Sequence, residues 1–277
     1  MRKADKYFVV AIKWQRVYAT TRTACVFFQY MVKQHFFKPP CVLYLMVFLV
    51  AGCASGQPKQ DKLDTAYTRK APHPDGTGKV YLGREIAQVM GAAGGEWLER
   101  DTRQAEEDVA LALSKMPLRP GSVVADIGAG TGYYSFRIAE RLPAGKLYAV
   151  EVQDAFIEAL EKRKREAKAL NLVVVKGSSI SPNLPDTSVD LALMVDVYHE
   201  LEYPQEMLQA LHNALKPEGK LLLIEYRAED PNVPIKALHK ISVAQVNKEL
   251  AANGFRLYKQ ETSLPIQHFL LYEKAPR

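Results

Sequence analysis

The 277-residue chain has only three cysteines, Cys25, Cys41 and Cys53, so residues 54–277 contain none. That region therefore offers no disulfide and no thiolate metal site, and we expect no metal there. An excess of basic charge is also missing from it. Residues 1–52 carry eight lysines and arginines against one aspartate, which leaves 29 basic against 30 acidic residues in 53–277. Because such a domain has no general basic surface, we expect no nucleic-acid partner.

A glycine-rich segment directly follows the apolar run Val123–Ile127, and Glu151 closes the next apolar run. This arrangement suits an adenosine cofactor, because glycines let the backbone turn beneath a ligand and the carboxylate accepts from ribose hydroxyls. The spacing is G-x-G-x-G, not the dinucleotide pattern G-x-G-x-x-G, and Asp126 before it suits a cationic ligand and not a pyrophosphate. The candidate cofactor residues are Asp126, Gly128, Gly130, Gly132 and Glu151.

Residues 124–132 resemble the first motif of class I S-adenosylmethionine-dependent methyltransferases, and other motifs follow in order. Ser188–Asp196 is similar to the family's fourth strand and its tip, and 215–224 resembles its Leu-Lys-Pro-Gly-Gly turn into strand five. The resemblance covers roughly residues 80 to 273 and implies S-adenosylmethionine as the cofactor. After strand three, many relatives carry an acid for the adenine amine. Here Ser178 follows Gly177, which implies a hydroxyl or backbone contact instead.

Strands and helices alternate from residue 123 onwards, as in an α/β doubly wound sheet. Strands are predicted at 123–127, 146–152, 172–175, 189–195, 220–226, 255–259 and 267–272, and helices at 133–142, 155–170, 204–215 and 242–252. The resemblance implies a Rossmann-like sheet of seven mostly parallel strands, the last one antiparallel. Residues 81–116 have helical spacing and are predicted to be an N-terminal helical segment. This segment either packs on the sheet or forms a lid over the cofactor.

The residues Asp196-Val197-Tyr198-His199-Glu200 occupy the carboxyl end of the fourth predicted strand. Methyl transfer depends mainly on orientation and a dry site, but a hydroxyl or carbon-acid acceptor also needs a base. His199 is the candidate base, Tyr198 is the second catalytic candidate, and Asp196 is expected to contact substrate or cofactor. The alternative is a loop in which the histidine and tyrosine only pack. The Asn-Pro-Pro-Tyr motif of amino-methylating enzymes is absent here, which favours a small-molecule or lipid-like acceptor.

The N-terminal residues indicate targeting. Residues 41–51 form an apolar run of signal-peptide length that ends before Gly52-Cys53, similar to a bacterial lipoprotein cleavage site. We predict a leader over 1–52, a start at Met31, a lipidated Cys53 that attaches the protein to a membrane of the bacterial cell envelope, a flexible tether over 53–79 and a methyltransferase domain over 80–277. The alternative for the leader is an uncleaved anchor.

Three functional hypotheses remain open at this point. The first is an exported, membrane-anchored methyltransferase, and the second is a non-catalytic module of the same fold that binds an adenosine-like ligand. The third, an NAD-type oxidoreductase, is disfavoured by the glycine spacing and by the lack of a second substrate domain. The presence of Asp126, the three glycines and Glu151 together favours the first hypothesis.

Overall fold

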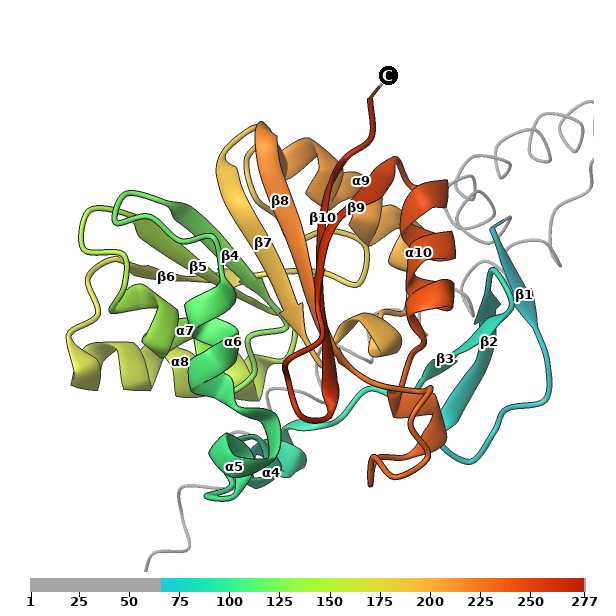
Figure 1. Cartoon of the computed structure of the whole chain (residues 1–277). Helices are drawn as coiled ribbons and strands as arrows, with labels where there is room; N and C mark the ends of the chain where they lie inside the picture. Colours follow the sequence, from blue (N-terminus) through green and yellow to red (C-terminus); the bar gives the residue numbers. More distant parts are fainter. Residues whose placement is uncertain (1–65, 277) are drawn as a thin grey trace, which may run out of the picture. The chain divides into compact units, whose positions relative to one another are not determined.

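A computed structural model describes residues 66–276, and these residues contain a seven-stranded sheet of order β6-β5-β4-β7-β8-β10-β9 (Figure 1). The first five strands in this order run parallel, and β10 pairs antiparallel with both β8 and β9. The predicted fold class is therefore confirmed. The strands are β4 (Val123–Ile127), β5 (Lys146–Glu151), β6 (Leu172–Lys176), β7 (Val189–Val195), β8 (Leu215–Tyr226), β9 (Phe255–Glu261) and β10 (Gln267–Lys274).

Helices cover both faces of this sheet. One buried cluster joins the sheet to α6 (Val109–Lys115), α7 (Tyr133–Ala139) and α8 (Asp154–Ala167), and a second joins it to α9 (Pro204–Ala214) and α10 (Val243–Ala252). Because successive strand residues point to opposite faces, the side chains of a single strand enter both clusters alternately.

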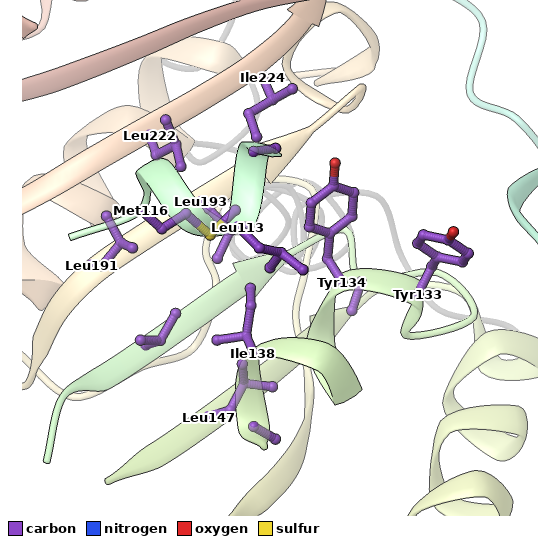
Figure 2. Close-up of a cluster of buried hydrophobic side chains, with 14 of the residues drawn as sticks. Leu113, Met116, Tyr133, Tyr134, Ile138, Leu147, Leu191, Leu193, Leu222 and Ile224 are labelled. Carbon is purple, nitrogen blue, oxygen red and sulfur yellow. The ribbon is translucent and has the colours of Figure 1, made fainter. Parts of the chain in front are cut away.

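The apolar runs of the central strands supply both clusters. Leu191 and Leu193 of β7 enter the first, whereas Ala192 and Met194 enter the second. Each fully buried leucine contributes about 1.5–3 kcal/mol. Figure 2 shows the first cluster, with the aliphatic side chains of α6, α7 and the strands in contact and the two tyrosines of α7 at its edge.

The N-terminal part of the described chain differs from the prediction. β1 (Tyr67–Arg69), β2 (Gly76–Tyr81) and β3 (Arg84–Ala87) form a separate antiparallel sheet. The prediction of a helix over residues 81–87 is therefore wrong. The prediction of a flexible tether that extends to residue 79 is also wrong, because β1 and the first half of β2 lie before that residue. The sequence signal for the hairpin is Leu82-Gly83, whose φ angles of 46° and 97° suit a two-residue turn.

Short helical segments link the small sheet to the main one. They are η1 (Ala92–Gly94), α4 (Gly95–Leu98), α5 (Arg103–Glu107) and then α6, which packs on the large sheet. In Figure 1, α4 and α5 lie at the foot of α6. Two later 3-10 turns, η2 (Tyr198–Glu200) and η3 (Ala237–His239), belong to the functional region described next.

The targeting predictions fall on residues outside the described part of the chain. These are the leader, the Met31 start, Cys53 and the first part of the tether. Among residues 66–276, no helix has the length and apolar character needed to cross a membrane.

Candidate active site

The glycine loop lies at the carboxyl edge of the sheet, where β4 ends. The backbone amides of Gly128 and Ala129 donate to the carbonyl of Val150 on β5, at 2.9 and 3.0 Å. Gly130 has a φ of 54°, and a Cβ atom there would lie 2.8 Å from Cδ1 of Leu98. Since L side chains rarely adopt that φ and the space above the residue is filled, this position requires glycine.

The other two glycines of the loop complete the turn into α7. Gly128 has a φ of 71°, and a Cβ atom there would lie 2.7 Å from the side chain of Val197. Gly132, with a φ of 83°, directly precedes the first residue of α7. The structure thus brings the three predicted glycines together in one tight loop between β4 and α7.

Glu151 faces this loop from the tip of β5, as the sequence predicts. Its Oε2 atom accepts from the amide of Gly130 at 2.9 Å. Its Oε1 atom accepts from the amides of Val152 and Gln153, at 2.7 and 2.9 Å. The carboxylate is 4% exposed, so backbone amides hold it in one orientation beside the loop. This is the position from which a carboxylate accepts from ribose hydroxyls.

Asp126 is buried beneath the loop, and its Oδ2 atom accepts from the hydroxyl of Ser135 at 2.5 Å. Burial raises the pKa of Asp126 to about 6, the charge of Glu151 adds to the increase, and the Ser135 hydrogen bond opposes it. Asp126 lines a cavity of about 30 Å³ that includes Thr131 and Tyr134. The hydroxyls of these two residues are buried without a hydrogen-bond partner among the described residues. Polar atoms left in this state suit a polar ligand.

A larger cavity of about 440 Å³ adjoins the small one, and Leu98 and Arg103 line both. Its rim is apolar and accessible, since Val89 is 54% and Trp97 is 47% exposed. The polar residues that line it include Asp196, His199, Glu200 and His239. The larger cavity therefore combines an apolar entrance with ionisable groups.

A buried charge network supports the wall between the two cavities. Glu107 is fully buried and accepts from Arg100 at 2.6 Å, from Arg103 at 2.8 Å and from the hydroxyl of Tyr226 at 2.8 Å. Three donors compensate the cost of burying this carboxylate. The network fixes α5, and with it Arg103, beside both cavities.

Asp196 lies at the tip of β7 with a φ of 55°, and it lines the larger cavity. Both of its carboxylate oxygens accept from Nε2 of Gln267, at 3.0 and 2.8 Å. Burial raises the pKa of Asp196 well above its ordinary value, and the charges of Glu107 and Glu225 raise it further, although Arg103 opposes them. Asp196 therefore binds a proton more readily than an ordinary aspartate does.

The prediction that His199 is a general base does not fit its surroundings. Its Nδ1 atom lies 2.6 Å from Oε2 of Glu225, and the side chain is 2% exposed. Burial acts to lower the pKa of His199, but Glu225 and Glu200 outweigh it and raise the pKa to about 10. A histidine with this pKa holds its proton at neutral pH, so it cannot accept another.

Tyr198 is also placed away from any substrate. It is fully buried, it lines neither cavity, and its hydroxyl donates to Oε2 of Glu249 at 2.7 Å. These surroundings favour the alternative of a packed, hydrogen-bonded side chain, and the catalytic role of Tyr198 stays a prediction.

Comparison with known proteins supports an assignment for the core of this region. Residues 125–221 match the family model described as a methyltransferase domain. This segment is a methyltransferase domain. The match begins within β4 and ends within β8, so it contains the glycine loop, Glu151 and the tip of β7. Proteins of this family and fold use S-adenosylmethionine.

Several proteins named as methyltransferases resemble the chain. A ubiquinone/menaquinone biosynthesis C-methyltransferase (UbiE) from Ruegeria sp. is 28% identical over 124 residues, 44% of this chain and 49% of that protein. A probable cobalt-precorrin-6B C(15)-methyltransferase from Sulfurisphaera tokodaii is 27% identical over 188 residues, 65% of this chain and 93% of that protein. The chain thus spans about half the length of the first relative.

The fold is also found in solved structures. A SAM-dependent methyltransferase from Aquifex aeolicus superposes with a TM-score of 0.63 at 23% identity, covering 66% of this chain and 98% of that one. The mitomycin 7-O-methyltransferase MmcR superposes with a TM-score of 0.55 at 16% identity, covering 63% of this chain and 54% of that one. These likenesses agree with the sheet order of the methyltransferase domain.

The segment that precedes the methyltransferase domain is partly a cover and partly a helical layer. Nε2 of Gln153 donates to the carbonyl of Met90 at 3.0 Å, and Arg163 donates to Glu99 at 2.8 Å and to the carbonyl of Thr131 at 3.1 Å. Residues 90–103 are therefore fastened over the loops that follow β4 and β5, whereas α6 packs on the sheet. Each predicted alternative thus describes a different part of the segment.

One predicted site residue, Ser178, lies away from both cavities, and several residues of the site were not predicted from the sequence. Ser178 lines neither cavity, and its hydroxyl accepts from the amide of Ser181 at 3.1 Å. Its adenine role stays a prediction. Sequence reasoning missed Glu225, although a lone acid at the end of an apolar strand is a usable signal. It also missed Arg103 and Glu107, whose spacing of four residues suits an ion pair on one helix.

Proposed function

We propose that this protein is an S-adenosylmethionine-dependent methyltransferase that acts on a small-molecule or lipid-like acceptor. The observation that carries the proposal is the placement of Glu151 against the amide of Gly130, in the glycine loop. Other residues of this loop line the small cavity, which adjoins the cavity of about 440 Å³. The cofactor, when bound, supplies a methyl group on a sulfonium that is already a good leaving group. The protein then has to hold two ligands in line and exclude water.

The residues around the glycine loop fit this cofactor. Glu151 is oriented to accept from ribose hydroxyls, and Asp126 supplies a carboxyl on the side of a cationic ligand. The buried hydroxyls of Thr131 and Tyr134 have no hydrogen-bond partner among the described residues, so they are available to a polar ligand. Leu98 lies over Gly130, so entry of the cofactor requires this side chain to move away from the loop.

The larger cavity indicates an amphiphilic acceptor. Val89 and Trp97 give it an accessible apolar entrance, and both acidic and basic side chains, among them Asp196 and Arg103, line the rest of it. A molecule with an apolar body and a hydroxyl or enol group satisfies both parts. The names of the UbiE relatives, which refer to ubiquinone/menaquinone biosynthesis, support an acceptor of this kind.

The proposal extends to location. The apolar run before Cys53 supports attachment to a membrane of the bacterial cell envelope through a lipidated cysteine, which suits a lipid-like acceptor. The alternative function is a module of the same fold that binds an adenosine ligand without turnover. The presence of a second, acceptor-sized cavity beside the glycine loop favours the enzyme.

Calorimetry of the full chain with S-adenosylmethionine, S-adenosylhomocysteine and NAD tests the cofactor. We expect binding of the first two ligands only. Glu151→Ala should weaken S-adenosylhomocysteine binding roughly tenfold or more, because a hydrogen bond to a charged acceptor contributes about 1.5–3 kcal/mol. Gly130→Val should abolish it, because a β-branched residue is strained at the φ of 54° that this loop position requires.

Two results would count against the proposal. Unchanged affinity in both variants means that the ligand binds elsewhere. Tight binding without transfer of a labelled methyl group to any component of membrane and envelope extracts indicates the non-catalytic module. The Ser178→Ala variant is a useful comparison, because the Ser178 hydroxyl bonds to the backbone of Ser181 and not to the glycine loop. Its substitution should therefore change affinity less than Glu151→Ala does.

A further inference from the structure

Two histidines and a glutamate meet at the wall of the larger cavity. His199 and Glu200 belong to η2, which follows β7, and His239 ends η3. One ligand atom from each of the three lies within 4.8 Å of the others. Nε2 of His199 is 3.7 Å from Oε1 of Glu200, and Nδ1 of His239 is 3.2 Å from the same oxygen.

These separations suit a transition-metal ion. Zinc binds histidine nitrogen and carboxylate oxygen at about 2.0–2.2 Å, which places the ligand atoms of a tetrahedron roughly 3.3–3.6 Å apart. Two of the three separations therefore need only a few tenths of an ångström of adjustment. A set of two histidines and one carboxylate is typical of metal centres that keep a coordination position open.

The groups behind the cluster have the arrangement of an outer ligand shell. Nδ1 of His199 is 2.6 Å from Glu225, so this carboxylate orients the ring and directs Nε2 towards Glu200. Carboxylate–histidine–metal chains of this kind fix the ring and raise the basicity of the ligand. The second oxygen of Glu200 accepts from the amide of Met90 at 3.2 Å, which fixes the glutamate as well.

The surrounding charge is also favourable. Glu200 and Glu225 place two carboxylates beside one imidazole, at 3.7 and 2.6 Å from its two nitrogens, and this concentration of negative charge favours a divalent cation. Two cations of this region are already paired. Arg84 is bound to Glu249 at 2.8 and 2.9 Å, and Lys236 to Asp75 at 2.5 Å.

We propose that His199, Glu200 and His239 bind a divalent transition-metal ion of the zinc class, with Glu225 as the positioning residue and an open coordination position facing the larger cavity. The sequence did not predict this site. The expectation of no metal rested on the absence of cysteines, and the two histidines are 40 residues apart in the chain. In the proposed function, on which this role rests, the ion would bind the acceptor oxygen as a Lewis acid and ease the loss of its proton.

The site can be tested without turnover. The full chain, without a polyhistidine tag and stripped of metal with a chelator, is dialysed against Zn²⁺, and the bound metal is measured by mass spectrometry. Co²⁺ in place of Zn²⁺ reports the coordination through its visible spectrum, and Mg²⁺ is the hard-cation comparison. We expect one equivalent of Zn²⁺ or Co²⁺ at this site and no comparable binding of Mg²⁺.

Variants separate this site from other histidines. His239→Ala should weaken binding roughly 100-fold or more, and Glu225→Gln by about 10–100-fold, the range typical of an outer-shell change. His268→Ala is the matched control, because His268 contacts Glu229 at 2.8 Å and belongs to no such cluster among the described residues. The side chain of His239 is 20% exposed and contacts Glu200, so the thermal midpoint of His239→Ala is measured beside its metal binding to separate loss of the site from loss of the fold.

The outcomes are distinct from those of the cofactor test. Absence of Zn²⁺ and Co²⁺ binding at micromolar free metal overturns the inference, and so does binding that His239→Ala leaves unchanged. A chain that binds S-adenosylhomocysteine but no metal keeps the proposed function and loses this site. A chain that binds metal but no S-adenosylhomocysteine does the reverse.

Discussion

The ion pair between Arg84 and Glu249 joins the small sheet to α10, and its removal should destabilise the protein strongly. Arg84 donates to both oxygens of Glu249, at 2.8 and 2.9 Å, and also to the carbonyl of His199 at 3.0 Å. Glu249 additionally accepts from Tyr198 and Gln245, at 2.7 and 2.8 Å. The side chains of the pair are 9% and 0% exposed, so water can replace few of these contacts.

The expected size follows from this burial. Glu249→Leu leaves the buried Arg84 guanidinium charged and without a carboxylate, which costs about 3–5 kcal/mol. For a domain of this size, that loss lowers the thermal midpoint by roughly 6–20 °C. Adding Arg84→Met removes the uncompensated charge, so the double variant should recover about 2 kcal/mol or more. It should not recover completely, because the Tyr198 hydroxyl and the His199 carbonyl lose their partners.

The assay is urea denaturation of the wild type, both single variants and the double variant, analysed as a double-mutant cycle. The matched control is Arg256→Met, since Arg256 pairs with Glu273 at 2.6 Å but is 57% exposed on its side chain. An exposed pair of this kind contributes less than about 1 kcal/mol. A loss for Glu249→Leu no larger than that of the control, or additive effects of the two single changes, would refute the reasoning.

The remaining predictions concern the loop carboxyl and the leader. Because the pKa of Asp126 is raised to about 6 from 3.8, its ionisation opposes folding increasingly from about pH 4 to pH 6. Asp126→Asn should therefore gain stability relative to the wild type across this window, approaching roughly 3 kcal/mol above it. Parallel profiles in urea denaturation at several pH values would contradict this. Cys53→Ser should release the protein from the membrane fraction of bacterial cells. An intact mass that corresponds to an unprocessed chain beginning at Met1 would count against lipidation.

The sequence predicted the parts of the molecule that local patterns define. The apolar run Val123–Ile127 and the glycines after it coincide with β4 and its loop, and Glu151 ends β5 as expected. Parallel topology then brings the strand tips together without further information. The hairpin around Leu82-Gly83 was missed because Ile86 and the residues after it also fit a helical period.

The acceptor side could not be predicted in the same way. His199, Glu225 and His239 belong to different elements, and no local spacing indicates that they meet. The raised pKa of His199 likewise depends on two carboxylates, one of which comes from β8. A motif therefore suggested a base, whereas the carboxylates that surround the buried ring raise the pKa of His199.

Leu98 and Arg103 are shared by the walls of the two cavities, and this has a thermodynamic consequence. A ligand in one cavity that shifts the position of these residues changes the free energy of binding in the other. By linkage, the factor by which the cofactor alters affinity for the acceptor equals the factor by which the acceptor alters affinity for the cofactor. The affinity of either ligand measured alone therefore does not give the coupling free energy between the two cavities.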